Sequence, residues 1–320
     1  MNSQHRLRKL LHHNLFPIVM IFIVVVAVNA YLQPGFFSFD VLQSNLASFT
    51  PLVLASMAQA VVILVGGIDL SVGMSITLAT VIMAATMDSS SSSIAFGIIL
   101  SIVATLGVGA LNGFVIGYLK LPPIISTFAV SSICYGAALL IMPQPGGYIP
   151  YSFYETYQTN IASFLPMPLV MIIVGLLIWA FIRRRKIYRY IYAVGGSEPA
   201  AFANGINTKK IKLYAFMIAS IFIVLTALAV VAQTATGDAN MGRAYTLNSI
   251  AAVVIGGISL QGGKGSLFGA VLGALILGFI SNIIFFAELS SFYQDLIKGL
   301  IIIFALTLSI LPTIRKKALA

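Results

Sequence analysis

Apolar stretches of about 20 residues recur from one end of this chain to the other, which is the length that an α-helix needs to cross a bilayer. Hydrophobic residues make up 59% of the chain and charged residues 8%, whereas a soluble domain carries roughly 25% charged residues. No stretch is polar enough to form a separate soluble domain. We therefore predict an all-α polytopic membrane protein in which residues 1–320 form a single transmembrane domain.

Hydropathy predicts about ten transmembrane helices. The candidate spans are 16–32, 47–65, 74–87, 94–118, 123–142, 166–182, 213–232, 246–258, 265–286 and 294–311. Six of them precede a large basic loop at 183–212, and four follow it. Because both numbers are even, the N-terminus, this loop and the C-terminus are expected on the same side of the membrane.

Basic residues gather at the two ends of the chain and in the large loop. They are Arg6, Arg8, Lys9, Arg183, Arg184, Arg185, Lys186, Arg189, Lys209, Lys210, Lys212, Arg315, Lys316 and Lys317. Cationic residues beside apolar spans mark the cytoplasmic side and contact anionic lipid, so both termini and the loop are expected in the cytoplasm. The net charge of +10 follows from these flanks and does not predict nucleic-acid binding.

Two similar glycine turns interrupt apolar runs 190 residues apart. Residues 66–70 read Gly-Gly-Ile-Asp-Leu, residues 256–260 read Gly-Gly-Ile-Ser-Leu, and another glycine follows each leucine by three residues. The neighbouring spans 74–87 and 246–258 are too short to cross the bilayer as straight helices. We predict two pseudo-repeats with glycine-broken short helices, buried in protein along a translocation pathway. The candidate pathway residues are Gly66, Gly67, Asp69, Gly73, Gly256, Gly257, Ser259 and Gly263.

Asp69 is a carboxylate at membrane depth, which makes it a candidate functional residue. Ser259 occupies the matching position of the second turn, and aspartate and serine share the ability to cap a helix N-terminus. We therefore expect Asp69 to cap the helix that restarts after the turn. Lining of the pathway and proton coupling are the alternatives.

The basic loop contains the signals of a short helix. Ser197 is a good N-cap, Glu198 and Pro199 suit the first turn, and Gly205 suits a left-handed C-terminal cap. A helix of about six residues is therefore expected, either as an ordinary capped turn or as a docking helix for a cytoplasmic partner. The candidate coupling residues are Gly195, Gly196, Ser197, Glu198, Ala200, Ala201 and Gly205.

Four motifs in sequence order resemble those of one transporter family. They are the octapeptide at 66–73, Leu111-Asn112-Gly113 with Leu121-Pro122-Pro123-Ile124, Tyr192-Ala193-Val194-Gly195-Gly196, and the glycine-rich stretch at 250–266. Together they resemble the permease subunits of ribose-type ABC importers, and the resemblance covers residues 45–311. It implies a multi-pass protein of the bacterial inner membrane that imports a monosaccharide or another small polyhydroxylated solute.

The resemblance also implies partners. They are two cytoplasmic ABC ATPase subunits that dock on the 183–212 loop, a periplasmic or lipid-anchored solute-binding protein, and a second permease that is either a copy or a paralogue. The stretch Gly262-Gly263-Lys264-Gly265-Ser266 lacks the spacing of a phosphate-binding loop. We therefore expect no cofactor on this chain and no enzymatic activity, with ATP and magnesium bound by the partner ATPase.

An ion-coupled secondary transporter is the alternative. It requires a coupling-ion site, for which the residues within or near the membrane core are Asp69, Asp295 and Lys298. An intramembrane enzyme is a third class, but no carboxylate pair or nucleophile–base set is evident. All three histidines lie within the first thirteen residues, so no metal site is expected in the membrane.

Overall fold

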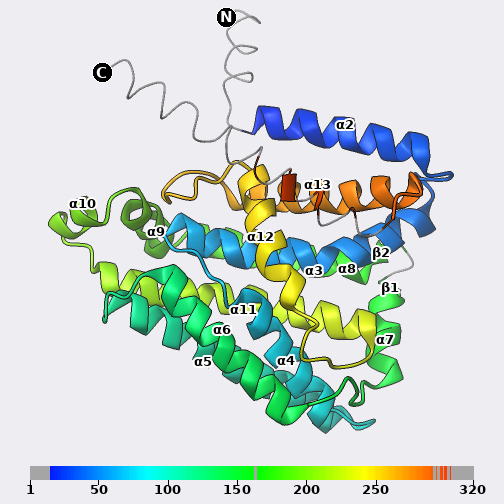
Figure 1. The fold of residues 1–320 in the computed structure, drawn as a ribbon, viewed down its shortest axis with the longest axis horizontal. Coiled ribbons are helices and arrows are strands. Elements are labelled where there is room, and N and C mark those ends of the chain that lie inside the picture. Colours follow the sequence, from blue (N-terminus) through cyan, green and yellow to red (C-terminus); the bar gives the residue numbers. More distant parts are fainter. Residues whose placement is uncertain are drawn as a thin grey trace, which may run out of the picture.

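The computed structural model describes residues 15–161, 164–290 and the single positions 293, 296, 297, 299, 300 and 303 (Figure 1). This part of the chain is almost entirely helical. The helices are α2 (Phe16–Leu32), α3 (Phe39–Leu64), α4 (Val72–Thr86), α5 (Ser91–Gly117), α6 (Pro123–Ile141), α7 (Tyr151–Gln158), α8 (Met167–Arg183), α9 (Lys186–Gly196), α10 (Glu198–Ala203), α11 (Thr208–Thr234), α12 (Arg243–Ile255) and α13 (Leu267–Phe286). A short antiparallel pair, β1 (Asn160–Ile161) and β2 (Leu165–Pro166), places Asn160 opposite Pro166.

Nine of the ten predicted spans coincide with helices, and the tenth, 294–311, lies largely outside the described residues. Five helices are long and apolar enough to cross a membrane, namely α3, α5, α6, α11 and α13. The number rises to six if α8 and α9, which are bent by 84° relative to each other, count as one span. An all-α polytopic membrane protein is therefore confirmed, while the count of ten and the pseudo-repeats stay predictions.

The short helix α4 lies at the centre of the bundle. Its residues from Val72 to Ala84 are all buried, and α3 and α11 are mostly buried beside it. By contrast, α5 and α6 bury only 22% and 28% of their apolar windows, and they lie together along one edge of the molecule (Figure 1). Apolar side chains that face outward on a membrane protein meet lipid or another subunit, so the outer helices have the composition of the core.

Glycines allow α5 to pack closely against α11. A methyl group at Gly113 would lie 2.6 Å from Leu213 Cα, and one at Gly117 would lie 2.7 Å from the Lys209 carbonyl oxygen. Gly109 lies one helical turn before Gly113, and a methyl group there would lie 2.8 Å from the Phe216 carbonyl oxygen. Such spacing of small residues brings helix backbones together where lipid supplies no hydrophobic drive for association.

Three of the described helices lie outside the predicted spans, namely α7, α9 and α10, of which α10 is the short loop helix expected from the sequence. Helix α7 follows the loop after α6, and its Tyr157 hydroxyl donates to the Ala47 carbonyl of α3 at 2.9 Å. Helix α9 occupies part of the basic loop 183–212 and buries Ile191 and Val194 on one face. The loop is thus largely helical, because an amphipathic helix can lie along the bundle while its cationic residues stay exposed.

The contrast between two glycines of α5 tests this packing. Gly109→Val is expected to lower the free energy of unfolding by about 1–3 kcal/mol, because the side chain overlaps Ser220 and the backbone of α11. Gly107→Val lies two residues away and meets nothing within 4 Å, so it controls for the change in helix propensity. Thermal unfolding in detergent compares the two variants, and equal losses would contradict the packing described here.

Candidate functional site

The first glycine turn ends α3 with a left-handed cap. Gly66 has φ of +89°, its N–H donates to the Ile63 carbonyl at 2.9 Å, and the Gly67 N–H donates to the Val62 carbonyl at 3.0 Å. These paired bonds are the Schellman arrangement, which satisfies carbonyls that the helix end leaves free. Glycine is favoured at the left-handed position because it has no Cβ.

The second turn ends α12 in the same way, but one residue later in the motif. Gly257 has φ of +73° and donates to the Val254 carbonyl at 2.9 Å, while the Ile258 N–H donates to the Val253 carbonyl at 3.1 Å. The sequence aligns Gly66 with Gly256, whereas the caps make Gly66 equivalent to Gly257. The two turns therefore share a cap geometry. The alignment of the two sequence motifs is shifted by one residue from the alignment of the two caps.

Asp69 is buried and holds the start of α4. Its Oδ1 accepts from the Ser71 N–H at 2.7 Å and from the Ser71 hydroxyl at 2.6 Å, and the Asn112 amide donates to that hydroxyl at 2.8 Å. Ser71 is the residue directly before α4, so Asp69 fixes the turn that leads into the helix and bonds no helical N–H. The prediction that Asp69 caps this helix is therefore wrong. Its neighbour Leu70 is held by Thr127, whose hydroxyl accepts the Leu70 N–H at 2.9 Å.

Ser259 has a different role from the one expected by analogy with Asp69. Its hydroxyl accepts the N–H of Gln261 at 3.3 Å, but the next helix begins only at Leu267. Ser266 caps that helix by accepting the Phe268 N–H at 3.3 Å. The analogy between Ser259 and Asp69, on which the expected capping role of Asp69 was based, therefore does not hold, because a longer glycine-rich loop intervenes in the second turn.

Gly73 and Gly256 each lie where two helices meet. The Gly73 N–H donates to the Thr246 hydroxyl at 3.2 Å, and a methyl group at Gly73 would overlap the Gly242 backbone, so α4 and α12 cross there in close contact. A methyl group at Gly256 would overlap the carbonyl of Gly269 on α13. A methyl group at Gly67 would lie 3.2 Å from Val62 Cγ1, so this glycine is also closely packed.

The predicted coupling segment has the helix and caps expected from its sequence. Helix α10 spans six residues, Ser197 caps it by accepting the Ala200 N–H at 3.4 Å, and Gly205 follows with φ of +78°. Ala200 and Ala201 lie within this helix, and Ala201 is buried. Gly195 and Gly196, however, form the last turn of α9 and not a loop.

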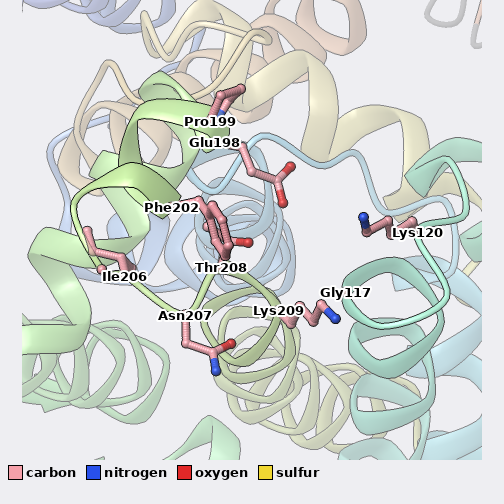
Figure 2. A pocket seen from close by; sticks show the side chains of 10 residues that line it. Gly117, Lys120, Glu198, Pro199, Phe202, Ile206, Asn207, Thr208 and Lys209 are labelled. Carbon is pink, nitrogen blue, oxygen red and sulfur yellow. The ribbon is translucent and has the colours of Figure 1, made fainter.

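A groove of about 810 Å³ lies between α10 and the end of α5 (Figure 2). Its lining residues are Gly117, Lys120, Glu198, Pro199, Phe202, Gly205, Ile206, Asn207, Thr208 and Lys209. Glu198 pairs with Lys212 at 2.6 Å. Partial burial raises the pKa of Glu198, but the hydrogen bond and charge of Lys212 outweigh it and hold the pKa below its ordinary value, with help from Lys120. The groove therefore keeps a charged carboxylate beside an exposed Phe202.

Three glycine segments meet beside this groove, and we call their contact the glycine junction, made of Gly66, Gly195, Gly196, Gly262 and Gly263. The Gly263 N–H donates to the Leu64 carbonyl at 3.0 Å. A methyl group at Gly195 would overlap that carbonyl, and one at Gly262 would lie 2.8 Å from both Gly66 Cα and the Gly195 carbonyl oxygen. The structure thus brings two of the predicted coupling residues, Gly195 and Gly196, into contact with both glycine-rich turns.

Tyr192 and Thr127 belong to the site but were not among its predicted residues. The Tyr192 hydroxyl donates to the Gly265 carbonyl at 3.0 Å and ties α9 to the second turn. Tyr192 stands within the Tyr-Ala-Val-Gly-Gly motif, so its position beside Gly195 was a usable signal. Thr127 binds the first turn from α6, a contact that no local pattern in the sequence predicts.

Comparison with known proteins gives consistent matches. The sequence model of the family described as "Branched-chain amino acid transport system / permease component" matches residues 41–306. The chain is 31% identical to the ribose import permease protein RbsC of Haemophilus influenzae, over 88% of this chain and 89% of that protein. It is 30% identical to RbsC of Bacillus subtilis, over 91% of both chains, and 28% identical to the galactose/methyl galactoside import permease protein MglC of Salmonella typhimurium, over 94% and 95%. No solved structure matches the chain significantly.

Two substitutions of Asp69 separate hydrogen bonding from charge. Asp69→Asn keeps an oxygen that can accept from Ser71, so we expect thermal stability close to that of the unchanged protein. Asp69→Leu leaves the buried Ser71 N–H without its acceptor and is expected to cost about 1–3 kcal/mol. Thermal unfolding in detergent measures both variants. Equal losses would show that the turn needs the negative charge.

Proposed function

The chain belongs to the family of branched-chain amino acid transport system permease components, and on this premise we propose that it is the membrane-spanning permease subunit of an ABC importer. The family match covers most of the chain, and the similar relatives are import permeases of nearly the same length. Such a subunit moves a solute by alternating access and forms no covalent bond with it. The glycine junction carries the proposal most directly, because it connects an exposed cytoplasmic helix with two breaks in the bundle.

The proposed cargo is a monosaccharide or a similar small polyhydroxylated solute. The similar relatives are named for ribose, allose, galactose and fructose, whereas the family description names branched-chain amino acids. An amino acid carries two opposite charges that need partners inside a membrane. Among the described residues Asp69 is the only buried charged side chain, and it is already bonded to Ser71. The other buried polar side chains are neutral, which suits a neutral, hydroxyl-rich solute.

ATP hydrolysis is assigned to a partner subunit. The sequence contains no phosphate-binding loop of the Gly-x-x-x-x-Gly-Lys-Ser/Thr type, so the proposal places ATP and magnesium on an ATPase and no cofactor on this chain. The ATPase docks on α10, where Phe202 is 71% exposed beside the groove. An exposed aromatic side chain on a short rigid helix is a good anchor for a partner's pocket.

The distribution of charge supports an orientation in the membrane. Helix α9, which carries Lys186 and Arg189, lies at the end of the bundle that carries α10, whereas α7, which contains Glu155, lies at the opposite end (Figure 1). By the positive-inside rule the α10 end is cytoplasmic, which places the solute-binding protein at the other end. A second permease, identical or paralogous, completes the assembly through the sparsely buried outer helices.

An ion-coupled secondary transporter has less support. Its coupling-ion site would use Asp69, which is engaged by Ser71, together with Asp295 and Lys298, which lie outside the described residues. The family and the similar relatives are permease components of multi-subunit systems. An exposed, capped α10 also has an evident use in a permease that is driven by a docked ATPase.

Reconstitution into vesicles tests the function directly. The permease with its ATPase and binding protein is expected to hydrolyse ATP faster in the presence of one member of a monosaccharide panel and to accumulate that sugar. The binding protein is included because it is expected to select the solute. Leucine serves as the control solute, because the family description names branched-chain amino acids. Accumulation by the chain without an ATPase would overturn the importer assignment, and stimulation by leucine alone would overturn the sugar assignment.

Truncation of the proposed anchor tests ATPase docking. Phe202→Ala is expected to weaken co-purification of the ATPase by about tenfold, since loss of an interface anchor commonly costs more than 1 kcal/mol. Phe164→Ala removes a similarly exposed phenylalanine from the opposite end of the bundle and serves as the control. Unchanged co-purification in Phe202→Ala, with a normal yield of permease, would refute docking through α10.

A further inference from the structure

We propose that the glycine junction is the element that transmits movement of α10 to both broken-helix turns at once, with Gly195 and Tyr192 as its positioning residues. The inference rests on the proposed function, because it concerns how a docked ATPase acts on the pathway. It goes beyond that function by naming the contact through which the two are coupled.

The first step concerns the end of α3. The last carbonyls of a helix have no partner within the helix, and a buried one needs a donor from elsewhere. Leu64 is the last residue of α3, and its carbonyl receives the N–H of Gly263 from the second turn at 3.0 Å. The two turns are therefore joined directly by a backbone hydrogen bond between segments that are far apart in the sequence.

The second step concerns Gly195, which is pressed against that same bond. A methyl group at Gly195 would overlap the Leu64 carbonyl oxygen and would lie 2.7 Å from the Gly263 N. On the other side, a methyl group at Gly263 would lie 2.5 Å from the Gly196 Cα. The contact is backbone against backbone on all three segments, so no side-chain rotamer is available to absorb a displacement.

The third step concerns the connection from Gly195 to α10. Ser197 ends α9 and at the same time caps α10, so no flexible linker separates the two helices. The carbonyl of Ala193 accepts the Ser197 N–H at 3.1 Å, and the carbonyl of Ser197 accepts the Ala201 N–H at 2.9 Å. A displacement of α10 must therefore move the end of α9, and with it Gly195.

Tyr192 provides a second tie, which a side chain of α9 makes instead of its backbone. Tyr192 lies one helical turn before Gly196, and its hydroxyl donates to the Gly265 carbonyl at 3.0 Å. Gly265 has φ of +118°, and a methyl group there would lie 2.6 Å from the Ile258 Cα, so this part of the loop packs tightly on the second turn. Helix α9 is thus fixed to the second turn at two points, on Gly263 and on Gly265.

Two adjacent glycines allow a matched test in the full reconstituted assembly. Gly195→Ala is expected to lower the ratio of solute transported to ATP hydrolysed by about fivefold or more. Fivefold is about the smallest effect that coupling between two sites usually has. Basal ATP hydrolysis and ATPase co-purification are expected to stay unchanged. Gly196 contributes only its backbone to the junction, and a methyl group there would meet nothing within 4 Å. Gly196→Ala keeps that backbone and is therefore expected to behave like the unchanged protein.

A milder pair covers the case in which Gly195→Ala fails to assemble. Tyr192→Phe removes only the hydroxyl that bonds Gly265 and is expected to lower the same ratio, by about fivefold or more, with basal hydrolysis intact. Tyr190→Phe, on an exposed position of the same helix, is the control. The ratio of transport to hydrolysis is not altered by a loss of folded protein, which lowers both rates together.

The outcomes separate this inference from the proposed function. If the unchanged assembly shows no solute-dependent hydrolysis, the proposed function fails. If the unchanged assembly transports solute but Tyr192→Phe and every assembled Gly195→Ala complex match it, the junction proposal alone is overturned. An equal loss of coupling in Gly196→Ala and Tyr190→Phe would also overturn it, because those changes touch no other segment of the junction.

Discussion

The free carbonyl at the end of α3 is the constraint on which the centre of this structure depends. Inside a membrane protein no water is available to satisfy it, so a donor must come from another segment. Gly263 supplies that donor, but it can approach Leu64 only because Gly66, Gly195 and Gly262 leave room for the backbones. The breaks in α3 and α12, and the end of α9, are thereby held at one point.

Around this point small residues set the closest helix contacts. They bring α5 onto α11 and α4 onto α12, where backbones meet, while large apolar side chains fill the rest of the core and also cover the outside. Buried neutral polar groups such as Thr127 and Asn112 hold the turns without adding charge. A path through such a structure offers hydroxyls, amides and backbone groups, which is the chemistry that the sugar-import relatives would use.

The apolar spans, the two turns and the six-residue α10 could be predicted because each depends on local sequence: hydropathy, paired glycines, and a serine cap with a closing glycine. Helix α9 was missed because its amphipathic pattern lies among cationic residues. Those residues were interpreted only as the basic loop that marks the cytoplasmic side of the membrane. The one-residue shift between Gly66 and Gly257 escaped prediction because adjacent glycines leave the left-handed position undetermined. The capping role expected for Asp69 was wrong because the parallel with Ser259 hid the longer second loop and the acceptor lies two residues before the N-cap. No local pattern reveals that residues 64, 195 and 263 meet.

The absence of side chains at the glycine junction also has a mechanical consequence. Ordinary helices interlock through ridges and grooves of side chains, and relative sliding requires those side chains to change rotamers. Gly195, Gly262 and Gly263 present smooth backbone surfaces instead. Such a surface transmits a push, because the backbones cannot interpenetrate. The bonds from the Gly263 N–H to the Leu64 carbonyl and from the Tyr192 hydroxyl to the Gly265 carbonyl hold the segments in place, so a compressed junction can only move as one unit.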